Sequence, residues 1–172
     1  MPLNNHSPII LMYHGTPANK PTSQYSIQAR NFVHHLKYFK KKGWQTALIK
    51  DLHNPAPLPE KTVILTFDDG YADNYLNALP ILKENNLKAT FFIASGFLNG
   101  GRMWNDTVIE TLRNYNGASL DLTKIALDNY KTETKIEKEQ AASQIISKIK
   151  HLNPKQRTEC TNYIATYADS LP

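Results

Sequence analysis

The chain has 172 residues, enough for one domain with a hydrophobic core and too few for two domains of ordinary size. Its hydrophobic content of 41% and charged content of 20% are typical of a globular protein and exclude an intrinsically disordered one. The net charge of +5 comes from scattered lysines, and the one dense run, Lys37–Lys42, lies on a predicted helix whose opposite face is apolar. We interpret this run as a solvated helix face, rather than a contact for an acidic polymer, and expect no nucleic-acid partner.

Compartment signals are few. Cys160 is the only cysteine, so the chain contains no internal disulfide. Residues 1–6 have neither the basic nor the apolar part of a secretory signal, and no stretch approaches the length of a membrane span. We therefore expect a cytoplasmic protein without a membrane span, or a protein of the cell envelope if a leader has been removed.

The first hundred residues alternate between predicted strands and helices. Strands are expected at residues 8–15, at 44–49, through Val63–Leu65 and at Leu87–Ala94, and helices at 27–42 and, with a kink at Pro80, from Tyr75 through Leu76, Leu79 and Leu82. Leu87–Ala94 is almost continuously apolar, as expected for a strand buried on both faces. Strand-helix-strand alternation predicts parallel strands joined by crossover helices.

Residues 101–172 have a different character and contain no signal for a buried strand. We expect a helix at 104–115 capped by Asn105 or Asp106, and a small hairpin within 119–130. A capping box at 134–137 precedes a helix to about residue 151, and Asn153-Pro154 opens another. The organisation predicted is a single, partial domain over 1–172, with a β/α core at 8–100 and a mainly helical elaboration at 101–172.

Two adjacent carboxylates are the most informative feature of the chain. Asp68 and Asp69 follow the apolar run Val63–Leu65 and precede Gly70, at the carboxyl end of a predicted strand, where ligands gather in α/β proteins. Neighbouring side chains on a regular strand point to opposite faces, but Gly70 allows a turn that lets both acids face one pocket. One carboxylate can then bind a divalent metal while the other accepts a proton from metal-bound water. The alternative is an acidic pair that caps a helix or lies in a turn.

The motifs around these acids resemble those of the polysaccharide deacetylases of the NodB-homology type, carbohydrate esterase family four. The matching segments, within residues 8 to 113, are Leu11–His14, Leu65–Tyr71, Leu79–Leu82 and Lys88–Ile93. The resemblance implies an α/β fold, an incomplete and deformed (β/α) barrel with a helical C-terminal elaboration. It also implies a bacterial, metal-dependent hydrolase of carbohydrate metabolism that removes N-acetyl groups from N-acetylglucosamine-containing polysaccharide. Carried over by position, Asp68 would be the general base and Asp69 a ligand of a divalent metal, typically zinc.

The chain departs from the family pattern downstream. The family completes its metal site with a His-(Ser/Thr)-x-x-His motif, and no two of the six histidines here are four residues apart: His6, His14, His34, His35, His53 and His151. We therefore expect a chain truncated before that motif, with an incomplete metal site and an activity that is incomplete or absent.

Two further residues are candidates for contact with a glycan substrate. His14 ends the first predicted strand at the same edge as Asp68, where it can line the pocket or belong to a turn. Trp104 can stack on a sugar ring or anchor the core at a helix start.

Other functions stay open at this stage. The chain can be a non-catalytic domain that binds saccharide or associates with itself, as a homodimer through exposed sheet edges. A phosphotransfer receiver or magnesium phosphohydrolase also uses acids at strand ends. A receiver, however, needs a lysine at the end of a later strand and a threonine or serine before it, which this sequence does not show convincingly.

Overall fold

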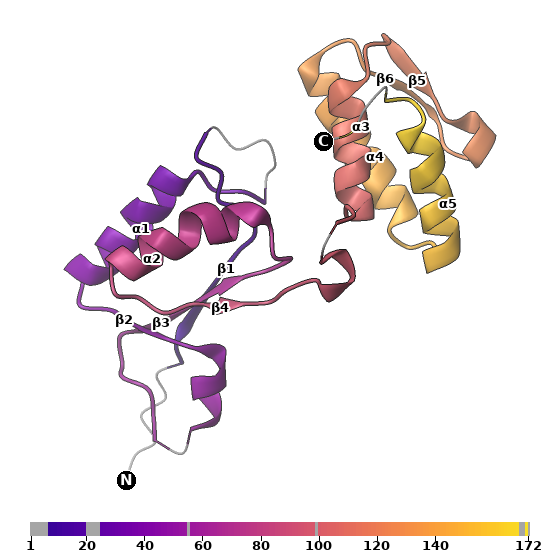
Figure 1. Ribbon diagram of the computed structural model, residues 1–172. Helices are drawn as coiled ribbons and strands as arrows, with labels where there is room; N and C mark the ends of the chain where they lie inside the picture. The colour runs from indigo at the N-terminus through magenta and orange to yellow at the C-terminus, as the bar shows by residue number, and fades with distance from the viewer. Residues whose placement is uncertain (1–6, 20–24, 55, 99, 169–170, 172) are drawn as a thin grey trace. The chain divides into compact units, whose positions relative to one another are not determined.

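The computed structural model describes residues 7–19, 25–54, 56–98, 100–168 and 171. The chain forms two compact units, Met1–Gly96 and Phe97–Pro172 (Figure 1). The boundary falls close to residue 100, where the character of the sequence changes. Each unit has its own hydrophobic core and is described separately.

The first unit is built on a parallel sheet. Its strands are β1 (Ile9–Tyr13), β2 (Gln45–Ala47), β3 (Thr62–Phe67) and β4 (Thr90–Phe91). All pairings in the described sheet are with β3, which pairs with β1 over its last five residues, with β2 over its first three and with β4 over its last two. The predicted α/β class and parallel pairing are confirmed. The described sheet is open, so a barrel remains a prediction.

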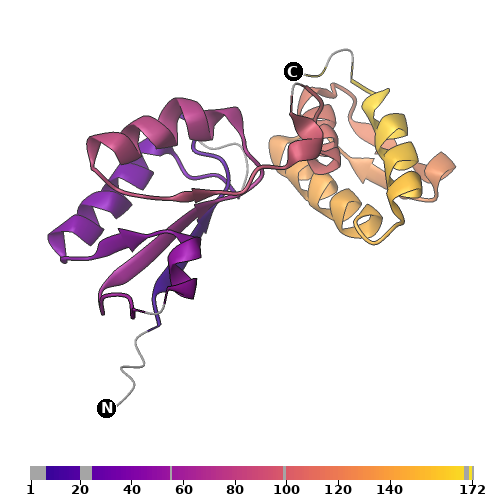
Figure 2. The same cartoon turned by 60° about the horizontal axis from the view of Figure 1, so that its bottom comes forward.

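Two helices cover one face of this sheet, α1 (Ala29–Lys41) and α2 (Leu79–Glu84), as Figures 1 and 2 show. A short 3₁₀ helix, Ile49–His53, follows β2. Alternate residues of β3 point toward the helices, as the two-residue period of a strand requires. The core on this face includes Phe32, Leu36, Phe39, Val63, Leu65, Phe67, Ala78 and Leu82.

The other face of the sheet is only partly covered, which corrects one prediction. The strand expected at Leu87–Ala94, buried on both faces, is the two-residue β4. Phe91 stacks on Phe67 within the core, with ring centroids 4.8 Å apart, but Phe92 is 49% exposed. Met12 of β1 is 63% exposed. The prediction of burial on both faces was wrong because α1 and α2 pack on a single side.

The segment before α2 also differs from expectation. A π-helical turn, Asn74–Ala78, leads directly into α2, and Pro80 is the second residue of α2. The turn just before the proline is thus irregular, as the kink predicted at Pro80 requires, because a proline ring disturbs the preceding helical turn. Tyr75 and Leu76, expected on the apolar face, are exposed.

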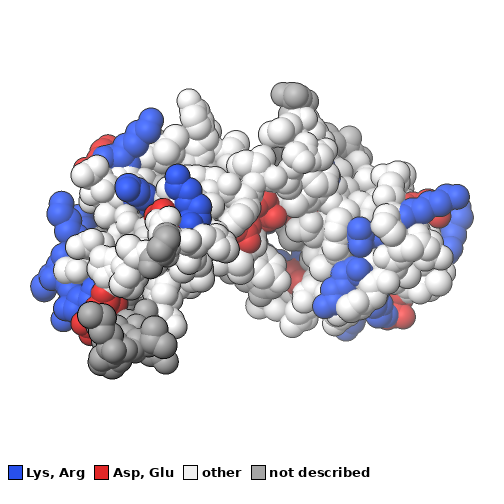
Figure 3. All heavy atoms as spheres, turned by 90° about the horizontal axis from the view of Figure 1, so that it is seen from below, with Lys and Arg blue, Asp and Glu red and all other residues white. Residues whose placement is uncertain are grey.

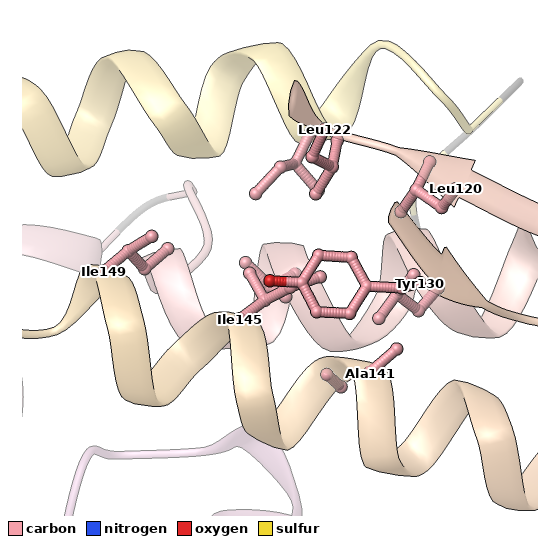
Figure 4. Packing of buried hydrophobic residues seen from close by; sticks show 10 residues of the cluster. Leu120, Leu122, Tyr130, Ala141, Ile145 and Ile149 are labelled. Atoms are coloured by element: carbon pink, nitrogen blue, oxygen red, sulfur yellow. The ribbon is translucent and has the colours of Figure 1, made fainter. Parts of the chain in front are cut away.

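The second unit packs three helices against a hairpin. They are α3 (Trp104–Asn114), α4 (Lys135–Ile149) and α5 (Pro154–Ala165), with strands β5 (Ser119–Asp121) and β6 (Asn129–Lys131). The strands pair antiparallel with Leu120 opposite Tyr130, which confirms the predicted hairpin. Figure 4 shows the Tyr130 ring among Leu122, Ala141 and Ile145 in the core.

The predicted helix starts of this unit are mostly confirmed. Thr134 accepts a hydrogen bond from the Glu137 N–H at 3.2 Å, and the Glu137 carboxylate accepts one from the Thr134 N–H at 2.9 Å. Asn153 caps α5 by accepting from the Gln156 N–H at 2.9 Å. The capping of α3 by Asn105 or Asp106 was wrong, because that helix begins at Trp104 and both residues lie inside it.

None of the helices in the described ranges is both long and apolar enough to cross a bilayer.

Candidate active site

Asp68 and Asp69 lie where the buried strand β3 ends. All six residues of β3 are buried, whereas both aspartates are half-buried, so neither carboxylate is sealed in the core or fully exposed. The Asp68 N–H donates to the carbonyl of Tyr13 at 2.9 Å. That bond joins the end of β3 to the end of β1 and brings His14, the residue that follows β1, to the same edge.

The backbone turns at Asp69, one residue before the expected position. Asp69 has φ of 73° and Gly70 has φ of 78°, two successive residues in the left-handed region. Aspartate tolerates this conformation better than most side chains, and glycine adopts it freely. A Cβ at position 70 would lie 3.1 Å from two side-chain carbons of Ile93, so a larger residue would be both strained and crowded.

His14 faces Asp69 across this edge. Its Nε2 atom lies 3.9 Å from Asp69 Oδ2, and the two side chains are 23% and 30% exposed. The separation is too long for a hydrogen bond but close enough for an ion pair or a shared cation. The His14 ring also lies near Tyr25, with centroids 5.8 Å apart. The predicted position of His14 at the Asp68 edge is confirmed; its role there stays a prediction.

The Asp68 carboxylate has no hydrogen-bond or ion-pair partner within the described part of the chain. A carboxylate without a structural partner keeps its lone pairs for a substrate or a water molecule. Its surroundings therefore differ from those of Asp69, which has the His14 ring as a neighbour.

A polar network that the sequence analysis missed fastens the loop after His14. The Thr16 hydroxyl lies 3.2 Å from the Asp73 carbonyl and 3.3 Å from Asn74 Oδ1, and Asn77 Nδ2 donates to the Thr16 carbonyl at 2.9 Å. Burial raises the pKa of the Asp73 carboxyl above its usual value. Hydrogen bonds from the backbone of Thr16 and Asn74 lower that pKa, but their effect is smaller than that of burial. The sequence feature that could have indicated this network is the acidic residue Asp73, four positions after Asp69 and at the start of the following helical segment.

Trp104 belongs to the second unit. Its ring packs against that unit's core and lies 5.3 Å from the Arg157 guanidinium, in cation-π geometry. These contacts agree with the core-anchor alternative, and stacking on a sugar stays a prediction.

The side chains at this edge of the sheet are of types that bind metal ions, but few of them come together. An aspartate oxygen and a histidine nitrogen are both good zinc ligands, so His14 and Asp69 fit two positions of such a site. Among the described residues, no group of three or more histidine, cysteine or acidic side chains converges. A hollow of about 510 Å³, lined by residues such as Ile49, His53 and Thr90, includes neither of these two residues.

The surface charge is dispersed. On the face that Figure 3 shows, lysine and arginine side chains form several separate groups rather than one continuous basic surface.

Comparisons with known proteins point in one direction. A family model described as polysaccharide deacetylase matches residues 56–153. A Bacillus subtilis (strain 168) protein whose name describes it as a polysaccharide deacetylase, YxkH, is 38% identical over 88 residues, which are 49% of this chain and 30% of that protein. Poly-beta-1,6-N-acetyl-D-glucosamine N-deacetylase of Escherichia coli (strain K12) is 37% identical over 62 residues, 34% of this chain and 9% of that protein.

Two solved structures are also similar. IcaB from Ammonifex degensii has 29% identity and a TM-score of 0.49, over 58% of this chain and 46% of that one. A de-N-acetylase from Aggregatibacter actinomycetemcomitans has 35% identity and a TM-score of 0.47, over 54% of this chain and 39% of that one.

The chain spans 9% to 30% of the length of the curated relatives it matches. The family model, in contrast, covers more than half of this chain, and Asp68 and Asp69 lie inside the matched range. The chain belongs to the polysaccharide deacetylase family.

Proposed function

We propose that this chain carries the base and part of the metal site of a hydrolase that removes N-acetyl groups from N-acetylglucosamine-containing polysaccharide. The observation that carries the proposal is the pair of half-buried carboxylates at the end of β3, one without a partner among the residues that the structure describes and one facing His14. Membership in the deacetylase family supports the choice of reaction. A relative named for poly-beta-1,6-N-acetyl-D-glucosamine supports the choice of polymer.

The two aspartates would divide the work. A bound divalent cation, for which zinc is the first candidate, supplies Lewis acidity and makes water a nucleophile at neutral pH. Asp69, whose backbone lies in the left-handed turn, would hold that cation. Asp68 would accept the proton of the attacking water and return it to the leaving amine, so that acetate and a free amino sugar result.

We expect the activity of this chain by itself to be low or absent. Only two donors, on His14 and Asp69, converge within the described ranges, and metal affinity depends on the number and geometry of ligands.

The test is acetate release from chitin oligosaccharide and from poly-β-1,6-N-acetylglucosamine, with zinc or cobalt added. Asp68→Asn keeps the size of the side chain but removes the base, so the rate should fall by about 10²- to 10⁴-fold. Glu139→Gln, an exposed change on α4, is the matched control and should leave the rate unchanged. If the parent releases acetate at a measurable rate, an equal rate for Asp68→Asn would refute the role of Asp68.

A second candidate is a self-associating domain without catalysis. It is favoured by the exposure of Ile10, Met12 and Phe92 on the uncovered face of the sheet, next to the edge strand β1 of the described sheet. The partner would be a second copy of the chain, because each copy has the same exposed edge strand and the two can pair symmetrically. A parent chain that releases no acetate and grows in mass with concentration in light scattering would favour this function.

A further inference from the structure

We infer that His14 is a metal ligand alongside Asp69, so that the end of β1 contributes directly to the metal site. The inference rests on the proposed role of Asp69 as a ligand and deepens it. Its ground is the 3.9 Å between His14 Nε2 and Asp69 Oδ2, across an edge where both side chains remain accessible.

The separation fits two ligands of one ion better than a direct bond between the residues. A hydrogen bond between a ring nitrogen and a carboxylate would bring the atoms to about 2.7–2.9 Å. Zinc bonds of about 2.0–2.2 Å at tetrahedral angles place neighbouring ligand atoms roughly 3.3–3.5 Å apart. The atoms therefore need to approach by only about half an ångström to share an ion.

The backbone on the His14 side is fixed by its neighbours. The Asp68 N–H is bonded to the carbonyl just before His14, at Tyr13. Gly15, just after it, accepts from the Ile27 N–H at 3.0 Å. A Cβ at Gly15 would lie 2.6 Å from the Ser26 hydroxyl oxygen, so the loop packs closely here. Ligands on fixed backbone lose little entropy when they bind an ion.

The backbone on the Asp69 side is equally constrained. The Ala94 N–H donates to the Asp69 carbonyl at 3.3 Å, and the Phe92 N–H donates to the Phe67 carbonyl at 2.8 Å. The turn that aims Asp69 is thus held between the ends of β3 and β4. The backbone that carries each donor side chain is therefore held by bonds that do not depend on an ion.

The tests are zinc titration by calorimetry and nitrogen-15 NMR of histidine side chains, on the whole chain. Since removal of even outer-shell partners lowers metal affinity about 10- to 100-fold, His14→Ala and His14→Gln should each weaken binding by about tenfold or more. Zinc should shift the Nε2 resonance of His14 and leave that of His34 unchanged. His34→Ala, on the exposed side of α1, is the matched control and should bind zinc like the parent.

Each outcome decides the inference. If Asp69→Ala loses zinc while His14→Ala and His14→Gln bind like the parent, His14 is not a ligand and the role of Asp69 survives. If the His14 variants lose zinc and Asp69→Ala does not, the shared site is refuted together with the metal role of Asp69. If the parent binds no zinc, the inference is overturned, and acetate release by the parent against Asp68→Asn decides the proposed function separately. Circular dichroism without metal confirms that the variants are folded.

Discussion

The two units differ in how completely they cover their hydrophobic side chains. In the second unit Leu120 and Leu122 of the hairpin and Ile145 and Ile149 of α4 are completely buried. In the first unit the helix-covered face of the sheet is equally well packed, but Met12 and Phe92 on the other face stay about half exposed or more. The candidate site lies at the edge of this partly covered sheet, so the chemistry and the closed core are found in different units.

If the core of the second unit is closed, a single buried side chain there should contribute a large share of the free energy of unfolding of that unit. Ile145 is completely buried on α4, so Ile145→Ala should lower the free energy of unfolding by about 2–5 kcal/mol. Ile136 on the same helix is 67% exposed, and Ile136→Ala is the matched control, expected to change it by less than about 0.5 kcal/mol. Urea unfolding followed by circular dichroism measures both, and equal effects would contradict a closed core around α4.

The packed face of the first unit can be tested with pH. Burial raises the pKa of Tyr13 from 10.0 to about 12. The folded state disfavours the ionised phenol, so stability is intact below pH 10 and is lost as the pH rises through about 12. The shift of about two pKa units corresponds to roughly 2–3 kcal/mol.

The measurement is urea unfolding of the first unit at pH 8 and at pH 11. Tyr13→Phe removes the ionising group and should show a smaller loss between these values than the parent. It also removes the 2.9 Å hydrogen bond to His35 Nδ1, which lowers stability at both values alike. Tyr38→Phe, at an exposed position of α1, is the control. A Tyr13→Phe protein as sensitive to alkali as the parent would show that Tyr13 is solvated.

The units also differ in how their helices begin. Thr134 caps α4 through its hydroxyl, whereas Gln28 at the start of α1 makes no capping bond with its side chain. Thr134→Ala should therefore cost about 1 kcal/mol of stability, and Gln28→Ala a few tenths. Thermal unfolding of the two variants makes the comparison, with Ser143→Ala in the exposed middle of α4 as control. A larger loss for Gln28→Ala would mean that α1 depends on its first turn more than on its packing.

Local signals explain what could be predicted from the sequence. The capping box at Thr134, the Asn153 cap and the hairpin opposite Leu120 each depend on residues within about a dozen positions. The position of His14 at the same edge of the sheet as Asp68 could also be predicted, because parallel strands end at one edge of a sheet. The caps and the hairpin need no knowledge of how distant segments pack, and the position of His14 needs only the parallel pairing of two strands.

The remaining features depend on contacts far apart in the chain. The left-handed turn at Asp69 is coupled to the crowding of Gly70 by Ile93, and the Thr16 hydroxyl meets Asp73 and Asn74 more than fifty residues away. The apolar run before Ala94 suggested burial on both faces, yet burial also requires an element to cover each face. Composition records that a side chain is hydrophobic and cannot record whether a covering segment is present.

The smallest expected effect on stability concerns the uncovered face itself. Met12 is 63% exposed, so Met12→Ser should change the free energy of unfolding by less than about 0.5 kcal/mol.

If this face pairs with a second copy, the same substitution, combined with Phe92→Ser, should lower the mass that light scattering detects at high protein concentration. Tyr38→Ser, which removes an exposed apolar side chain from α1 instead, should leave the mass unchanged. A parent that is monomeric at every concentration would rule out pairing. A large loss of stability in Met12→Ser would mean instead that the monomer covers this face in solution, and the contrast between the two units would then disappear.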